Sequence, residues 1–157
     1  MDFRIAMFIV SLVTFFTYVP FIWIKYGVQT SISDSYYALQ KDNLGYLFTL
    51  FCFLFAYPLA MVAGNIFVTP AAMLICLVGV ARGFKDSKVL KIAHMFGAYT
   101  GVALSQIGIW VSYDMWYVTL AFIGISGLLF ILDVKDKIWW VEILAFGSII
   151  GVLATTL

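Results

Sequence analysis

Six apolar runs occupy most of the chain, and each is close to the length needed to cross a lipid bilayer as a helix. They cover residues 3–24, 45–64, 66–82, 92–113, 116–132 and 138–157. The hydrocarbon core of a bilayer is about 30 Å thick, which takes about 20 helical residues. The segments between the runs are too short for a second, water-soluble domain. The pattern therefore predicts an all-α, polytopic integral membrane protein with one transmembrane domain, a compact bundle of six transmembrane helices.

Composition excludes most other classes of protein. Hydrophobic residues make up 64% of the chain and charged residues 11%, whereas soluble domains contain about 45–50% and about 25%. A chain like this has too little polar surface to fold as a soluble domain. Its formal net charge of +1 does not suit the basic surface that nucleic-acid binding requires, so no nucleic-acid partner is expected. The sequence contains no cofactor motif, and no cofactor is predicted.

The basic residues predict an orientation. With six spans, one face of the membrane carries a single basic side chain, Arg4, and the opposite face carries eight. Those eight are Lys25, Lys41, Arg82, Lys85, Lys88, Lys91, Lys135 and Lys137. Lysine and arginine accumulate in cytoplasmic loops. We therefore expect both termini to be non-cytoplasmic, in a cytoplasmic (inner) or plasma membrane.

Small residues recur at helical spacing in four of the runs, and we interpret them as helix-packing faces. Lipid tails are as apolar as leucine, so membrane helices associate through close backbone approach and hydrogen bonds. The predicted packing positions are Ala56 and Ala60 in the second run, Cys76 and Gly79 in the third, Gly97, Gly101, Ser105 and Gly108 in the fourth, and Gly147 and Gly151 in the sixth. The second, third and fourth runs are expected to form the packed core.

Three polar side chains inside the predicted helices are candidate binding residues. His94 is the only histidine, so a multi-histidine zinc site is excluded and no metal site is predicted. Its plain interpretation is a structural or interfacial contact, and the alternative is pH sensing or ligand binding. Gln106 lies deeper and needs a partner inside a bilayer, which makes it a candidate for subunit or ligand contact. Glu142 lies about one turn inside the sixth run, where it either reaches the headgroup region or pairs with a lysine or another chain.

Polar residues also recur every seven positions along the first run. They are Arg4, Ser11, Tyr18 and Lys25. This face either turns toward the bundle, a partner or a wet cleft, or it consists of end charges and of hydroxyls bonded to their own helix. The loop that follows is rich in hydroxyl groups, and Ser33 or Asp34 is expected to cap a short helix there. Arg4, Ser33 and Asp34 are therefore also candidate binding residues.

The connection between the second and third runs leaves two possibilities open. Gly64-Asn65 predicts a tight turn. Thr69-Pro70 is typical of an N-cap followed by proline in the first helical position. The third helix therefore either begins at Pro70, or it runs through that residue with a kink.

Three classes of function remain. The chain is expected to be a non-enzymatic membrane protein, a structural or assembly subunit or a partner-binding component that acts through helix packing and lipid contact. Its partners would be membrane lipids and other membrane subunits or further copies of itself. The alternative is a small transporter or channel-like protein, which the interrupted segment 64–70 would suit. An intramembrane enzyme has the least support because no nucleophile and base can be paired, and no catalytic residue is predicted.

Overall fold

The computed structural model describes residues 2–157, and these residues form seven helices and no strand. The helices are α1 (Phe3–Tyr26), α2 (Ser35–Gln40), α3 (Tyr46–Ala63), α4 (Val68–Val80), α5 (Lys88–Ser112), α6 (Trp116–Ile131) and α7 (Lys137–Thr156). The predicted all-α class is confirmed. Three helices, α1, α3 and α7, are long and apolar enough to cross a membrane, and α4 and α6 are apolar but shorter.

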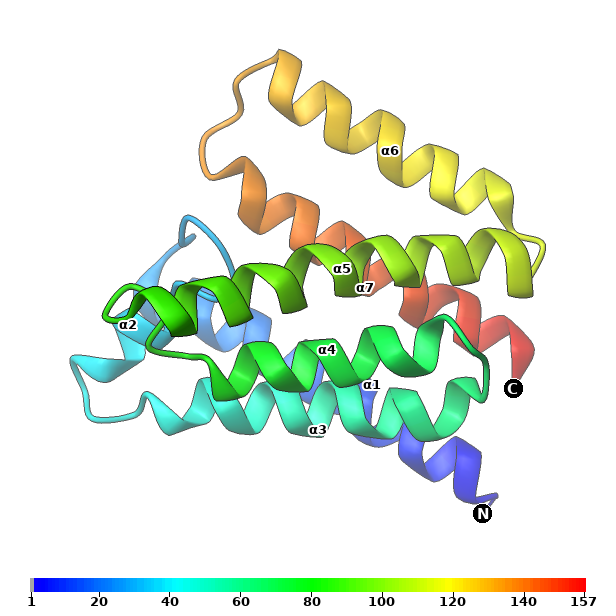
Figure 1. Cartoon of the computed structure of the whole chain (residues 1–157), viewed down its shortest axis with the longest axis horizontal. Coiled ribbons are helices and arrows are strands. Elements are labelled where there is room, and N and C mark those ends of the chain that lie inside the picture. The colour runs from blue at the N-terminus through cyan, green and yellow to red at the C-terminus, as the bar shows by residue number, and fades with distance from the viewer. Residues whose placement is uncertain (1) are drawn as a thin grey trace.

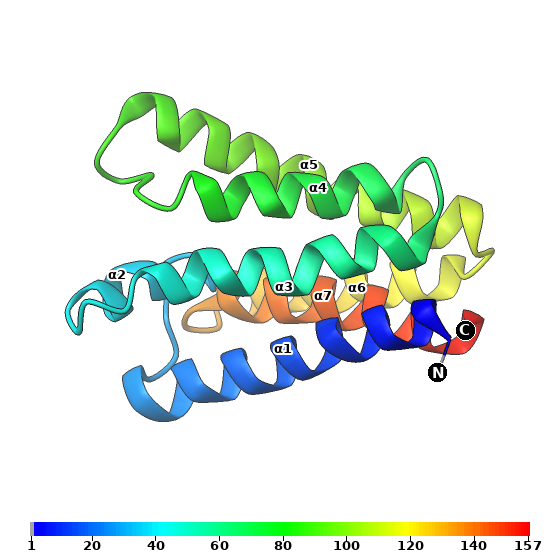
Figure 2. The ribbon, with the colours of Figure 1, turned by 90° about the horizontal axis from the view of Figure 1, so that it is seen from below.

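The six longer helices run side by side between two ends of the molecule (Figure 1; Figure 2). Both termini lie at one end, together with the turns at 64–67 and 113–115. The segment 27–45, which contains α2, lies at the other end with the connections 81–87 and 132–136. This second end carries eight of the nine basic side chains. We call it the lysine-rich end.

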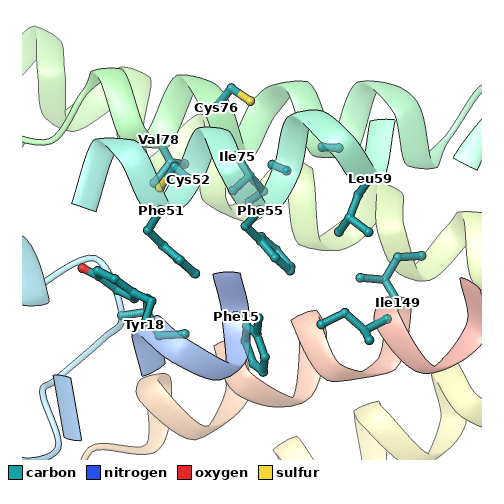
Figure 3. Packing of buried hydrophobic residues seen from close by; sticks show 14 of the residues in the cluster. Phe15, Tyr18, Phe51, Cys52, Phe55, Leu59, Ile75, Cys76, Val78 and Ile149 are labelled. Atoms are coloured by element: carbon teal, nitrogen blue, oxygen red, sulfur yellow. The ribbon is translucent and has the colours of Figure 1, made fainter. Parts of the chain in front are cut away.

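Aromatic side chains fill the space between α1, α3 and α7. Phe55 of α3 packs against Phe15 of α1 and Phe146 of α7, with ring centroids 5.7 Å and 4.9 Å away. Tyr18 of α1 stacks on Phe51 of α3 at 4.1 Å. Figure 3 shows the α1 and α3 rings pointing toward one another, with Ile149 of α7 beside them. The core is therefore a layer of large rings, and the small residues Ala56, Ala60 and Cys76 belong to the same buried cluster.

Small residues also lie where α3, α4 and α5 approach one another. Because glycine has no Cβ, two helix backbones can come closer at that point than at any other residue. A Cβ added to Gly79 of α4 would lie 2.6 Å from Cβ of Cys52 in α3. One added to Gly97 or Gly101 of α5 would lie 2.9 Å from the Leu74 carbonyl oxygen or 3.2 Å from that of Ala71, both in α4. The helix α4 is therefore in backbone contact with neighbours on two sides.

The heptad-spaced polar face of α1 turns toward the rest of the molecule. Ser11 is fully buried, and its hydroxyl donates to the Phe55 carbonyl oxygen at 2.8 Å. The Arg4 guanidinium donates to the Val62 carbonyl oxygen at 3.1 Å. At the opposite end of the helix, Lys25 forms a 2.8 Å ion pair with Asp42. Of the two arrangements left open by the sequence, the structure has the one in which this face contacts the bundle.

The start of α4 differs from both expectations for the Thr69-Pro70 pair. The helix begins at Val68, and Pro70 lies in its first turn, where no backbone N–H is required. Asn65 provides the cap, because its side-chain oxygen accepts from the N–H groups of Phe67 and Val68 at 3.0 Å and 2.7 Å. The Thr69 hydroxyl instead donates to the Ala60 carbonyl oxygen of α3. The turn is thereby fastened to the preceding helix.

The helix α6 is the least buried of the six longer helices. Only Thr119 of its 16 residues is buried, and in Figure 1 the helix stands apart from all but α5 and α7. A Cβ added to Gly124 or Gly127 of α6 would meet no atom within 4 Å. The same holds for Gly147 and Gly151 of α7. These two predicted packing positions therefore face open space within this chain.

Gly97→Ala and Gly124→Ala make a matched test of the contact between α4 and α5, because both place a better helix former inside a helix. At Gly97 the methyl group meets a backbone carbonyl, whereas at Gly124 it meets nothing. We expect Gly97→Ala to lower the free energy of unfolding by about 1–3 kcal/mol through overpacking. Gly124→Ala should leave it unchanged or raise it by about 0.5–1 kcal/mol. Thermal unfolding in mild detergent measures both, and equal stabilities would disprove the close contact at Gly97.

Candidate functional site

A polar pocket of about 220 Å³ lies at the lysine-rich end, between the segment 28–34 and the first turns of α5 and α7. Its lining residues are Thr30, Ser31, Ser33, Asp34, Phe84, His94, Met95, Ala98, Tyr99, Ile138 and Glu142. Four of the six predicted polar candidates are among them, namely Ser33, Asp34, His94 and Glu142. Residues more than 100 positions apart in the sequence therefore meet around one pocket.

Glu142 holds the segment 28–34 against α7. Its Oε2 accepts from the backbone N–H of Ile32 at 2.5 Å, and the Ile32 side chain is 2% exposed. Among residues 2–157, no basic side chain lies within 4.0 Å of the Glu142 carboxylate. Glu142 also borders a smaller cavity of about 20 Å³ that is lined by Phe51 and Cys52 of α3. The carboxylate therefore stands between the polar pocket and the apolar core.

Asp34 has a different environment, because a lysine neutralises it. Lys85, in the connection 81–87, places its ammonium group 2.6 Å from Oδ1 of Asp34. The same ammonium lies 4.7 Å from the ring centroid of Tyr37, and the Lys85 backbone N–H donates to the Tyr37 hydroxyl at 2.6 Å. Burial raises the pKa of Tyr37, so this hydroxyl stays protonated at neutral pH. These contacts bring the connection 81–87 next to the segment 28–34.

His94 forms the inner wall of the pocket and is 2% exposed. Phe84 stacks on its imidazole, with 4.0 Å between the ring centroids and 21° between the planes. The carbonyl groups of Val78 and Ala81, at the end of α4, also face the ring. Nevertheless, Nδ1 makes no hydrogen bond of normal geometry with residues 2–157. The imidazole is therefore packed between Phe84 and the end of α4.

The segment 28–34 is held in place by hydroxyl groups. The Ser31 hydroxyl accepts from the Asp34 backbone N–H at 3.1 Å, and the Ser35 hydroxyl donates to the Ile32 carbonyl oxygen at 2.5 Å. Ser35 also shares a buried hydrogen bond of 2.5 Å with the Tyr18 hydroxyl of α1. Such local bonds satisfy a turn that no helix or sheet supports. As a result, Ser33 and Asp34 stand at the pocket on a fixed backbone, and Asp34 precedes α2 without a side-chain cap bond.

The other two candidates lie elsewhere. Arg4 is near the termini, where it donates to α3. The Gln106 amide nitrogen donates to the Ser148 hydroxyl of α7 at 2.9 Å, while its backbone carbonyl accepts from Thr119 of α6 at 3.1 Å. Gln106 also lines an apolar groove of about 370 Å³ between α5 and α6. It therefore joins three helices and takes no part in the polar pocket.

The sequence did not predict roles for Phe84, which lines the pocket, or for Lys85, which pairs with the lining residue Asp34. The sequence identifies Lys85 only as one of the basic residues that predict the orientation, and it does not single out Phe84. Their position in a short basic connection directly before α5 gives no sign that the connection folds back over His94.

Two carboxylates and several hydroxyl groups line the pocket together with apolar side chains. Its carboxylate and hydroxyl oxygens suit a ligand that donates hydrogen bonds or carries positive charge. Among residues 2–157, no three His, Cys, Asp or Glu side chains are arranged to hold a metal ion. Comparison with known proteins finds no family model, no curated protein and no solved structure that matches the chain.

Proposed function

We propose that the chain is an integral membrane protein whose six longer helices cross the bilayer. The antiparallel arrangement and the apolar exterior support this proposal. Large exposed side chains occur on every one of these helices, for example Phe16, Leu54, Met73, Tyr99, Ile123 and Ile138. The helix α4 has 13 residues, or about 20 Å at the rise of an α-helix. It would need the flanking residues or a locally thinner bilayer to complete its span.

The lysine-rich end would lie in the cytoplasm, and both termini would lie on the other side. The difference of eight basic side chains against one supports this orientation. Lys41, Lys88 and Lys91 are exposed at that end. Lysines there also favour contact with anionic headgroups on the cytoplasmic surface.

Cysteine labelling tests this topology. We expect an impermeant thiol reagent added outside intact cells to label Thr156→Cys and to leave Lys41→Cys unmodified. Both positions are exposed, while the native Cys52 and Cys76 are 1% and 7% exposed and give a low background. Labelling after cell lysis is the control for reactivity. Labelling of both positions from the same side would contradict six spans.

Within the membrane, we propose that the protein is a non-enzymatic component that binds another membrane helix. The observation that carries this proposal is the open face of α7 at Gly147 and Gly151, which face no atom of this chain. The close helix contacts within the chain occur at glycines such as Gly97 and Gly101, where a neighbouring helix fills the space. A second helix, from a further copy or another subunit, would fill the face of α7 in the same way.

Gly147→Leu tests the association. We expect it to reduce cross-linked dimer or co-purified partner by about fivefold or more while the thermal stability of the monomer stays unchanged, since the side chain enters open space. Ala121→Leu is the matched control, because Ala121 is a small, exposed residue of α6 and the larger side chain meets lipid there. If both variants retain full association, the face of α7 is not the interface.

A second candidate, a small transporter, is favoured by the polar pocket at one end of the molecule. Glu142 borders both this pocket and the smaller cavity beneath it. Beyond that cavity, however, the rings of Phe15, Phe55 and Phe146 fill the core. Transport would require these rings to move apart. Substrate flux into proteoliposomes distinguishes a transporter from a binding component.

A further inference from the structure

Glu142 lacks a positive partner in a place where a carboxylate needs one. Its one hydrogen bond within residues 2–157 comes from a neutral backbone N–H, that of Ile32. Glu142 is half-buried, and an unpaired carboxylate that is shielded from water is costly to keep ionised. The polar pocket lies directly beside it. A positive group in the pocket would supply the missing charge.

The other carboxylate that lines this pocket, Asp34, is already paired with an ammonium group. The Lys85 ammonium lies 2.6 Å from the Asp34 carboxylate and 4.7 Å from the Tyr37 ring centroid. A carboxylate together with an aromatic face is a favourable environment for an ammonium group. Lys85 satisfies Asp34 but makes no ion pair with Glu142. The second carboxylate of the pocket is thus left for a cation from outside the chain.

The remaining polar groups around Glu142 are acceptors. Ser31 and Ser33 contribute hydroxyl oxygens. A primary ammonium group has three N–H donors, so it can bond to a carboxylate and two such acceptors together. A quaternary ammonium group has none. The arrangement therefore favours a primary ammonium over a methylated one.

We propose that the polar pocket binds a primary ammonium group, with Glu142 as its counter-charge and the surrounding hydroxyl groups as further acceptors. The pocket volume of about 220 Å³ is large enough to admit a group of the size of ethanolamine. Lys91, exposed and without an ion pair, lies one turn before Met95 on the same face of α5. It would bind a phosphate at the mouth of the pocket. Both a free amine and an aminophospholipid headgroup present this ammonium, and the lipid source depends on the membrane placement proposed above.

Ligand-dependent thermal stability of the detergent-purified full chain tests the proposal. A ligand that binds only the folded state raises the melting temperature. We expect phosphatidylethanolamine in mixed micelles to raise it by several degrees and phosphatidylcholine, which has no N–H donor, to leave it unchanged. Soluble ethanolamine is the arm for a free amine: a shift with ethanolamine alone assigns that source. Because this arm needs no bilayer, it separates a failure of the pocket from a failure of the membrane placement.

Glu142→Gln and Asp133→Asn are the matched variants, since each replaces a carboxylate by an amide of the same shape. We expect Glu142→Gln to raise the half-saturating concentration of the active ligand about tenfold or more, because a charge-assisted hydrogen bond becomes a neutral one. Asp133 is exposed and outside the pocket, so its variant should bind normally. Equal shifts with the two lipids, no shift with either amine, or an unchanged concentration for Glu142→Gln would each overturn the proposal. If Glu142→Gln does not fold, the comparison of the two lipids on the unmodified protein still decides.

Discussion

The close approach of backbones along α4 is the contact on which the rest of the structure depends. Gly79 lets α4 meet α3, and Gly97, Gly101 and Gly108 of α5 let α5 meet α4. In a lipid environment, burial of apolar surface does not by itself hold helices together, and short-range packing contributes most of the attraction. A three-helix layer with this spacing fixes where the ends of α4 and α5 lie. The connection 81–87, and with it Phe84 and Lys85, is positioned as a consequence.

The polar pocket lies beside that layer and depends on two long-range contacts. The N–H of Ile32 donates to Glu142, which joins a loop near the start of the chain to a helix near its end. The ion pair between Asp34 and Lys85 joins the same loop to the end of α4. Three parts of the sequence that share no local pattern therefore enclose one space. The bundle provides the frame, and these two contacts determine the chemistry at its lysine-rich end.

Much of this fold was accessible from the sequence, because apolar length and helical spacing act locally. The spacing of His94, Gly97 and Gly101 places them on one face of a helix, and that face lies against α4. The start of α4 was not accessible, since the Asn65 side chain, and not Thr69, caps it. For the pocket, the sequence predicted four of the individual residues. It could not predict that they lie together, because this depends on long-range contacts. Lys85 shows the limit, because a lysine in a loop has the same local sequence signal whether it is solvated or paired.

The helices α4 and α6 differ in burial, and this difference affects which substitutions each can accept during evolution. Every turn of α4 meets a neighbouring helix, so most of its positions tolerate few side-chain volumes. The helix α6 buries Thr119 alone, so its other positions must remain apolar but need no particular shape. Relatives of this protein should therefore keep the buried positions of α4 and exchange leucine, isoleucine and phenylalanine freely in α6. The two helices would accumulate substitutions at very different rates although their hydrophobicity is nearly the same.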